Sequence, residues 1–174
     1  ILMDKHAAQA KHIVAINRIK PHTKFRGPLG SGLTKMLTIG LGKGQGASLY
    51  HRFAVQHTFS ILQDAAKHIL DCCSVLFGLG VLEDGYRQVA KMAAIRPSTW
   101  FDEEQNLLEE ARSMMPAIPF GAIDVLVIDQ IGKDISGICM DSNVTGRHRD
   151  IVGDFVAPPH AKRIFVRDLS PDSD

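Results

Sequence analysis

Apolar residues along the chain gather into short continuous runs, and segments with a helical spacing of apolar residues separate these runs. Short apolar runs bounded by polar or turn residues are typical of buried strands. They predict strands at residues 13–16, 75–82, 123–128 and 164–166. The helical spacing predicts helices at residues 33–41, 47–70 and 100–115, the last of which ends at Pro116. Residues 88–95 fit either a strand or a short helix.

The order of these elements indicates the fold class. Strands alternate with helices, and this alternation is the sequence signature of helices layered on a largely parallel sheet. We therefore expect an α/β fold. Because the chain opens at Ile1 and stops soon after an apolar stretch, we also expect it to be an internal piece of a longer protein.

A loop is predicted between the first strand and the first long helix. Its sequence, KPHTKFRGPLGSG at residues 20–32, contains two prolines and three glycines. The loop follows the carboxyl end of a strand, where open α/β sheets bind their ligands. Ser31 is the predicted N-cap of the helix that follows. Lys35 falls almost opposite the apolar stripe of that helix, so we expect its side chain to point away from the core.

Residues with useful chemistry concentrate between His22 and His51. A loop imidazole can act as a general acid or base because its ordinary pKa, about 6.5, lies near working pH. A solvated loop histidine is the alternative for His22, and a solvated position on a helix surface is the alternative for Lys35 and His51. A dinucleotide-binding glycine pattern at residues 42–47 is a weak match, because that pattern must follow a strand. These glycines are expected instead to end a helix.

Composition limits the function classes. Hydrophobic residues make up 45% of the 174 residues and charged residues 22%, which is typical of a soluble globular protein. The net charge of +1 gives no general attraction to nucleic acid or to a membrane surface. No apolar run approaches the length of roughly 18–20 residues that a membrane span needs. The three cysteines form neither a CxxC pair nor an even set, so we expect a reducing, cytoplasmic compartment.

Two stretches resemble a known family. NRIKPHTKFRGPLGSGLTKMLTIGLGKGQGASLYH, residues 17–51, is similar to the cofactor-attachment region of the nickel-dependent lactate racemase family, particularly to its uncharacterised branches. DVLVIDQIGKDISGICMDSNVTGR, residues 124–147, resembles a second block of the same family. The blocks occur in the family's order, and the resemblance spans most of the chain.

The resemblance implies a cofactor and an activity. In that family a nickel pincer nucleotide, a pyridinium ring with two sulfur-containing arms, is joined covalently to a lysine, which here is Lys35. Its nickel is ligated by a histidine, here His51, sixteen positions later (51 − 35 = 16). A sulfur-rich pincer and one imidazole together suit Ni(II). The implied reaction is racemisation or epimerisation of a 2-hydroxy acid or a sugar acid by reversible hydride transfer.

The family also implies roles for other residues. His22 matches the catalytic acid/base that handles the substrate's hydroxyl proton. Gln130 and Lys133 match a pair near the substrate, where the lysine would neutralise a carboxylate or a developing oxyanion. Arg26 and Ser31 are the expected additional cofactor contacts. By family comparison a second acid/base histidine lies upstream of this chain, so we expect the chain by itself to be inactive.

Family architecture implies two lobes joined by helices. On that pattern residues 1–97 finish the first, cofactor-attaching lobe, residues 98–116 form a connecting helix, and residues 117–174 begin the second lobe. The expected partners are a small-molecule 2-hydroxy acid and the enzymes that make the cofactor, with no nucleic acid and no membrane.

Some residues depart from the family's pattern. Lys24 replaces an expected acid, Cys139 stands where a small residue is usual, and Asp141 and Asn143 have no assigned role. These differences favour a substrate other than lactate. Two alternatives remain open: a non-catalytic binding or regulatory relative that has lost the metal, and, less favoured, a nicotinamide (NAD) oxidoreductase that uses residues 42–47.

Overall fold

The computed structural model describes residues 1–23, 27–57, 60–147 and 158–173, which form two compact units. The first unit comprises Ile1–His22 and the described chain from residue 27 to Met115. The second comprises Thr23 and the chain from Pro116 onward. Each unit is described by itself.

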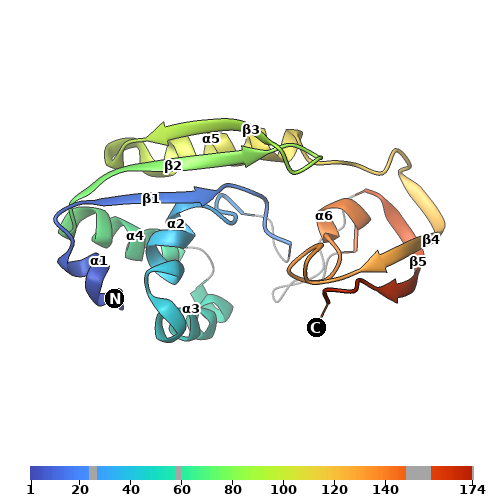
Figure 1. The fold of residues 1–174 in the computed structure, drawn as a ribbon, viewed down its shortest axis with the longest axis horizontal. Coiled ribbons are helices and arrows are strands. Elements are labelled where there is room, and N and C mark those ends of the chain that lie inside the picture. The colour runs from blue at the N-terminus through green and yellow to red at the C-terminus, as the bar shows by residue number, and fades with distance from the viewer. Residues whose placement is uncertain (24–26, 58–59, 148–157, 174) are drawn as a thin grey trace. The chain divides into compact units, whose positions relative to one another are not determined.

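The first unit mixes helices with three strands (Figure 1). Its helices are α1 (Lys5–Gln9), α2 (Leu33–Lys35), α3 (Lys43–His57), α4 (Ser60–Cys72) and α5 (Trp100–Ser113). A π-helical turn, η1 (Met36–Gly40), continues α2, and a 3-10 turn, η2 (Pro97–Thr99), precedes α5. Its strands are β1 (Ile13–Arg18), β2 (Val75–Glu83) and β3 (Val89–Ile95). The second unit contains β4 (Ala122–Ile131), α6 (Ser142–Thr145) and β5 (His160–Leu169).

The strand pairings confirm the predicted α/β class. β1 pairs with β2 in parallel, and β4 pairs with β5 in parallel. β3 pairs with β2 antiparallel, which makes the first sheet mixed. The reason is the short connection at Asp84, whose side chain accepts hydrogen bonds from the backbone N–H groups of Tyr86 (2.8 Å) and Gln88 (2.9 Å). A tight hairpin turn of this kind can join only antiparallel strands.

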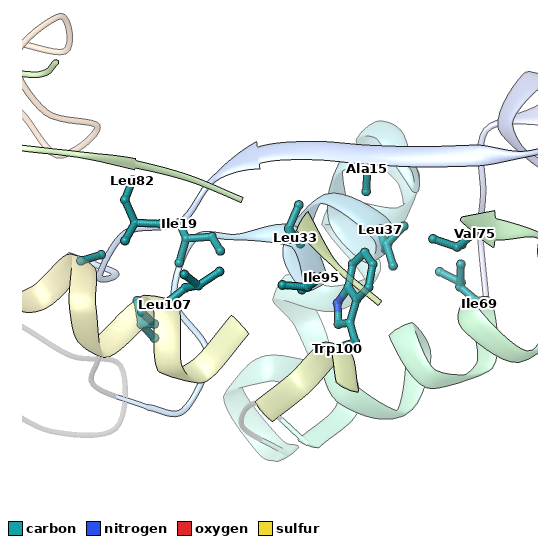
Figure 2. Close-up of a cluster of buried hydrophobic side chains, with 12 residues drawn as sticks. Ala15, Ile19, Leu33, Leu37, Ile69, Val75, Leu82, Ile95, Trp100 and Leu107 are labelled. Carbon is teal, nitrogen blue, oxygen red and sulfur yellow. The ribbon is translucent and has the colours of Figure 1, made fainter. Parts of the chain in front are cut away.

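The helices build the core of the first unit on one face of its sheet (Figure 2). Glycine at position 78 of β2 permits this packing, because an added Cβ would lie 2.7 Å from the Trp100 ring and 2.8 Å from Leu33. The buried side chains of the cluster are Ala15, Ile19, Leu33, Leu37, Ile69, Val75, Leu82, Ile95, Trp100, Leu107, Leu108 and Ala111. The opposite face of the sheet carries exposed apolar side chains, including Val14, Ile16 and Met92.

Helix α5 is an integral part of the first unit. The sequence analysis placed a connecting helix at residues 98–116, and α5 occupies that segment. Its buried face, which includes Trp100, Leu107 and Leu108, lies in the core described above. The segment expected as one helix at residues 47–70 contains two helices, α3 and α4.

A buried carboxylate holds the start of α2. Glu104 on α5 accepts hydrogen bonds from the backbone N–H of Thr34 at 3.0 and 3.2 Å, and from its hydroxyl group. The indole Nε1 of Trp100 donates to the same hydroxyl at 3.1 Å. The side-chain amide of Asn17 donates to the carbonyl of Gly32 at 2.9 Å. We call these five residues, Asn17, Gly32, Thr34, Trp100 and Glu104, the α2 frame.

The α2 frame replaces a local helix cap. The first N–H groups of a helix have no partner within the helix, and a side-chain oxygen usually supplies one. Gly32 occupies the N-cap position of α2 and has no side chain to serve. An added Cβ there would overlap a carboxylate oxygen of Glu104. The glycine therefore makes room for a cap that comes from α5.

Replacement of Glu104 by alanine should destabilise the first unit strongly. Glu104→Ala leaves the buried donors of Thr34 unpaired, and we expect it to lower the free energy of unfolding by about 2–4 kcal/mol. Urea unfolding followed by circular dichroism measures this loss. Glu109→Ala is the matched control, because Glu109 is exposed on the same helix in a surface pair with Arg112, worth roughly 0–1 kcal/mol. Equal losses for the two variants would contradict the assigned role of Glu104.

Candidate functional site

Lys35 lies at the end of α2 and is half-buried. The helical pattern predicted that its side chain would point away from the core, and the structure places it at an intermediate depth. Burial lowers the pKa of the Lys35 amine, and the like charge of Lys20 lowers it further. Both effects favour the uncharged amine, which is the nucleophilic form of a lysine.

The loop before α2 is closed at its base. The backbone N–H of Lys20 donates to the carbonyl of Ser31 at 2.8 Å, and the N–H of Ser31 donates to the carbonyl of Lys20 at 2.9 Å. Arg112 on α5 donates to the carbonyl of Gly27 at 2.9 Å. These contacts confirm that a loop follows β1, and they fix its two ends beside Lys35.

Ser31 does not cap α2 with its side chain. The N-cap position belongs to Gly32, and no side-chain hydrogen bond comes from that residue. The physical reason is that Ser31 is paired through its backbone with Lys20, which ends the loop one residue before the helix cap. The N-cap prediction for Ser31 is therefore wrong. Its predicted contact with a cofactor stays a prediction.

His22 belongs to the loop that precedes α2. His22 is half-buried. It comes two residues after Lys20, whose backbone is held by Ser31. Arg26 lies outside the described residues. His22 therefore lies in the loop that connects β1 to α2, the helix that carries Lys35.

His51 occupies an exposed position on α3. Its neighbour Tyr50 is buried and, with Leu49 and Phe53, lines an apolar hollow of about 510 Å³ that α4 completes. His51 is not among the residues that line this hollow. Its exposed imidazole is accessible to a ligand from solvent.

Gln130 and Lys133 lie in the second unit, near the end of β4. Gln130 is exposed on β4, opposite Asp168 of β5. Lys133 is exposed in the loop that follows. That loop is closed by a hydrogen bond from Gly132 N to Cys139 O at 2.9 Å. The carboxyl end of a parallel strand thus presents both side chains.

The structure shows local features of three residues in this region that the sequence did not predict. Cys139 has a φ of 71°, a conformation that glycine adopts without strain. Asp141 caps α6 by accepting from Asn143 N at 2.9 Å. Ser136 has a buried hydroxyl group without a hydrogen-bond partner among the described residues. A buried unpaired hydroxyl is unfavourable, so Ser136 is a feature that sequence reasoning missed, but its oxygen is closed to solvent and therefore not accessible to a ligand.

The buried Glu104 is a second residue that sequence reasoning missed. The acidic residues at the start of α5 suggested only a favourable interaction with the helix dipole. Glu104 nevertheless falls in the helical stripe formed by Trp100, Leu107, Leu108 and Ala111, all of which are buried. A single charged residue within an apolar stripe was the available signal.

The glycine pattern at residues 42–47 lacks the context of a dinucleotide-binding loop. It follows η1 and continues into the first turn of α3, whereas the nucleotide fingerprint follows a strand. Gly42 instead allows close packing of the turn, because an added Cβ would lie 2.5 Å from the carbonyl oxygen of Thr38. Gly42 follows the end of η1 at Gly40, as expected, but Gly44 and Gly46 lie within α3, so the expectation that these glycines end a helix is wrong for those two.

Among the described residues, no group of three or more histidine, cysteine, aspartate or glutamate side chains is arranged to hold a metal ion. None of the described helices combines the length and the apolar character that crossing a membrane requires. No family model matches the chain, and the searches of curated proteins and of solved structures find no match either.

Glu104 should make the stability of the first unit depend on pH. Burial raises the pKa of Glu104, and the hydrogen bonds from Thr34 oppose this only in part. The folded state therefore holds the proton more tightly than the unfolded chain, whose glutamate pKa is about 4.3. The free energy of unfolding should fall as pH rises from that value through the folded pKa.

Glu104→Gln removes this titration and should flatten that part of the profile. Urea unfolding at steps between about pH 4 and pH 7 measures the slope. Glu109→Gln is the control and should keep the wild-type slope. An unchanged slope in Glu104→Gln would show that the carboxyl group titrates alike in the folded and unfolded states.

Proposed function

We propose that this chain belongs to a racemase or epimerase that acts on a 2-hydroxy acid or a sugar acid. In this proposal a nickel pincer nucleotide is joined to Lys35, and His51 is the protein ligand of its nickel. The family resemblance of residues 17–51 and 124–147 suggests the assignment, and the environment of Lys35 is the observation that carries it.

The amine of Lys35 suits covalent attachment of a cofactor. Its pKa is lowered by burial and by Lys20, so a larger fraction is uncharged at neutral pH than for a solvated lysine. The α2 frame fixes the helix that carries it, through the contacts of Glu104 with Thr34. A nucleophile on a fixed backbone reacts at a defined position, which a covalently held cofactor requires.

The imidazole of His51 suits the metal. It is exposed on α3 and accessible, and a neutral imidazole is a good ligand for Ni(II). When bound, the cofactor supplies a centre that accepts the hydride of the substrate and returns it to either face. The residues present therefore match the group in donor chemistry: one amine for attachment and one imidazole for the metal.

The remaining candidate residues would bind the substrate and move its proton. His22 would take the hydroxyl proton as the hydride leaves, and would return it in the reverse step. Lys133 would neutralise the substrate carboxylate, and Gln130 would donate a hydrogen bond to the substrate.

Mass spectrometry of the protein tests this proposal. After co-expression with the enzymes that make the cofactor, we expect one adduct per chain at Lys35 and one bound nickel. Lys35→Arg should lose both. Lys43→Arg is the matched control, because Lys43 is an exposed lysine of the next helix, and it should keep both.

The histidine variant separates the two parts of the proposal. His51→Ala should keep the adduct at Lys35 and hold nickel at least about tenfold more weakly. An unmodified Lys35 together with no bound nickel in the wild-type protein would favour the alternative of a non-catalytic relative. An adduct that survives Lys35→Arg would show attachment elsewhere.

A further inference from the structure

The exposed side of α4 places an imidazole and a thiol one helical turn apart. Cys72 Sγ lies 3.6 Å from His68 Nε2 and 3.9 Å from His68 Nδ1. The two residues are separated by four positions, the spacing that brings side chains together on one helix face. Both side chains are exposed, and neither has a place in the proposed racemase chemistry.

The distance between the sulfur of Cys72 and the nearer imidazole nitrogen of His68 is similar to the distance between two ligand atoms of a tetrahedral metal ion. Zinc-like ions bind a cysteine sulfur at about 2.3 Å and a histidine nitrogen at about 2.0–2.1 Å. With a tetrahedral angle between these bonds, the sulfur and the nitrogen lie about 3.5–3.6 Å apart. The distance from Cys72 Sγ to His68 Nε2, 3.6 Å, equals this value, but the sulfur also lies 3.9 Å from Nδ1, so the imidazole must rotate to direct Nε2 at an ion shared with the sulfur.

The helix holds the pair in place and leaves room beside it. Residues Ala65, Ala66 and Ile69 of α4 are buried, so the backbone between the two donors is fixed on the core side. His68 also lines the hollow of about 510 Å³ between α3 and α4. Open space next to the imidazole leaves further coordination positions accessible to water.

We propose that His68 and Cys72 chelate a thiophilic divalent cation, such as Zn²⁺, Co²⁺ or Ni²⁺. On binding, the thiol of Cys72 releases its proton to solvent and coordinates as the thiolate, and the imidazole of His68 coordinates through Nε2. Water completes the tetrahedral shell, because the described residues provide no third ligand group. Soft sulfur and imidazole donors select these ions over Mg²⁺ and Ca²⁺.

A cobalt titration tests the proposal. The reduced chain, expressed without the cofactor-making enzymes, is titrated with Co²⁺ while the near-ultraviolet band of thiolate-to-cobalt charge transfer is recorded. We expect one Co²⁺ per chain with this band, and its loss when Zn²⁺ is added in competition. Because no cofactor is present, the result is independent of the racemase proposal.

Two variants and two controls locate the ligands. Cys72→Ser should abolish the charge-transfer band, and His68→Ala should weaken Co²⁺ binding about tenfold or more. Cys139→Ser and His12→Ala, which change another thiol and another surface imidazole, should bind like the wild type. The substitutions at 68 and 72 lie at exposed positions, and unchanged circular dichroism would confirm that the fold is kept.

Three results would overturn the proposal. The first is the absence of a charge-transfer band in the wild-type chain. The second is a band that persists in Cys72→Ser and disappears in Cys139→Ser. The third is equal Co²⁺ affinity in His68→Ala and the wild type.

Discussion

A carboxylate buried in the first unit is the constraint on which the candidate chemistry of that unit depends. Glu104 is only 3% exposed, and burying a carboxylate is unfavourable unless hydrogen bonds replace its water. Thr34 supplies those hydrogen bonds through its backbone N–H and its hydroxyl group. The carboxylate in turn provides an acceptor for the backbone N–H at the start of α2, so each group replaces the hydrogen bonds that the other would make with water.

The α2 frame connects the core to the loop that carries the candidate residues. Trp100 belongs to the hydrophobic cluster and also donates to Thr34, so the packing of α5 sets the position of α2. Asn17 ties Gly32 to β1, and the paired backbones of Lys20 and Ser31 close the loop next to it. Lys35 ends the helix that this frame holds, and burial together with the charge of Lys20 lowers the pKa of its amine.

Local patterns in the sequence were sufficient for much of the fold. Continuous apolar runs located β1, β2, β4 and β5, and the glycines and prolines of residues 20–32 located the loop. The secondary structure of residues 88–95 could not be predicted, because the apolar residues of this segment are spaced neither as in a strand nor as in a helix. Its antiparallel pairing depends on the turn at Asp84, whose side chain acts on backbone groups that a periodicity argument ignores.

The candidate site was less predictable, because its contacts join distant positions. Glu104 and Thr34 are seventy positions apart, and no local rule links a glutamate on one helix to the start of another. The same contact explains why glycine stands at position 32, and the backbone pairing of Ser31 with Lys20 explains why Ser31 is not the cap. The half-burial of Lys35 likewise depends on neighbours such as Lys20, which helical periodicity does not include.

An NMR titration of the ε-carbon of Lys35 tests the central claim most directly. The account predicts that the Lys35 amine titrates below the ordinary lysine value of about 10.4, and that Lys20→Gln moves its pKa part of the way back. A Lys35 pKa at or above the ordinary value, unchanged by Lys20→Gln, would contradict the account, because the amine would then be solvated and would have no special reactivity.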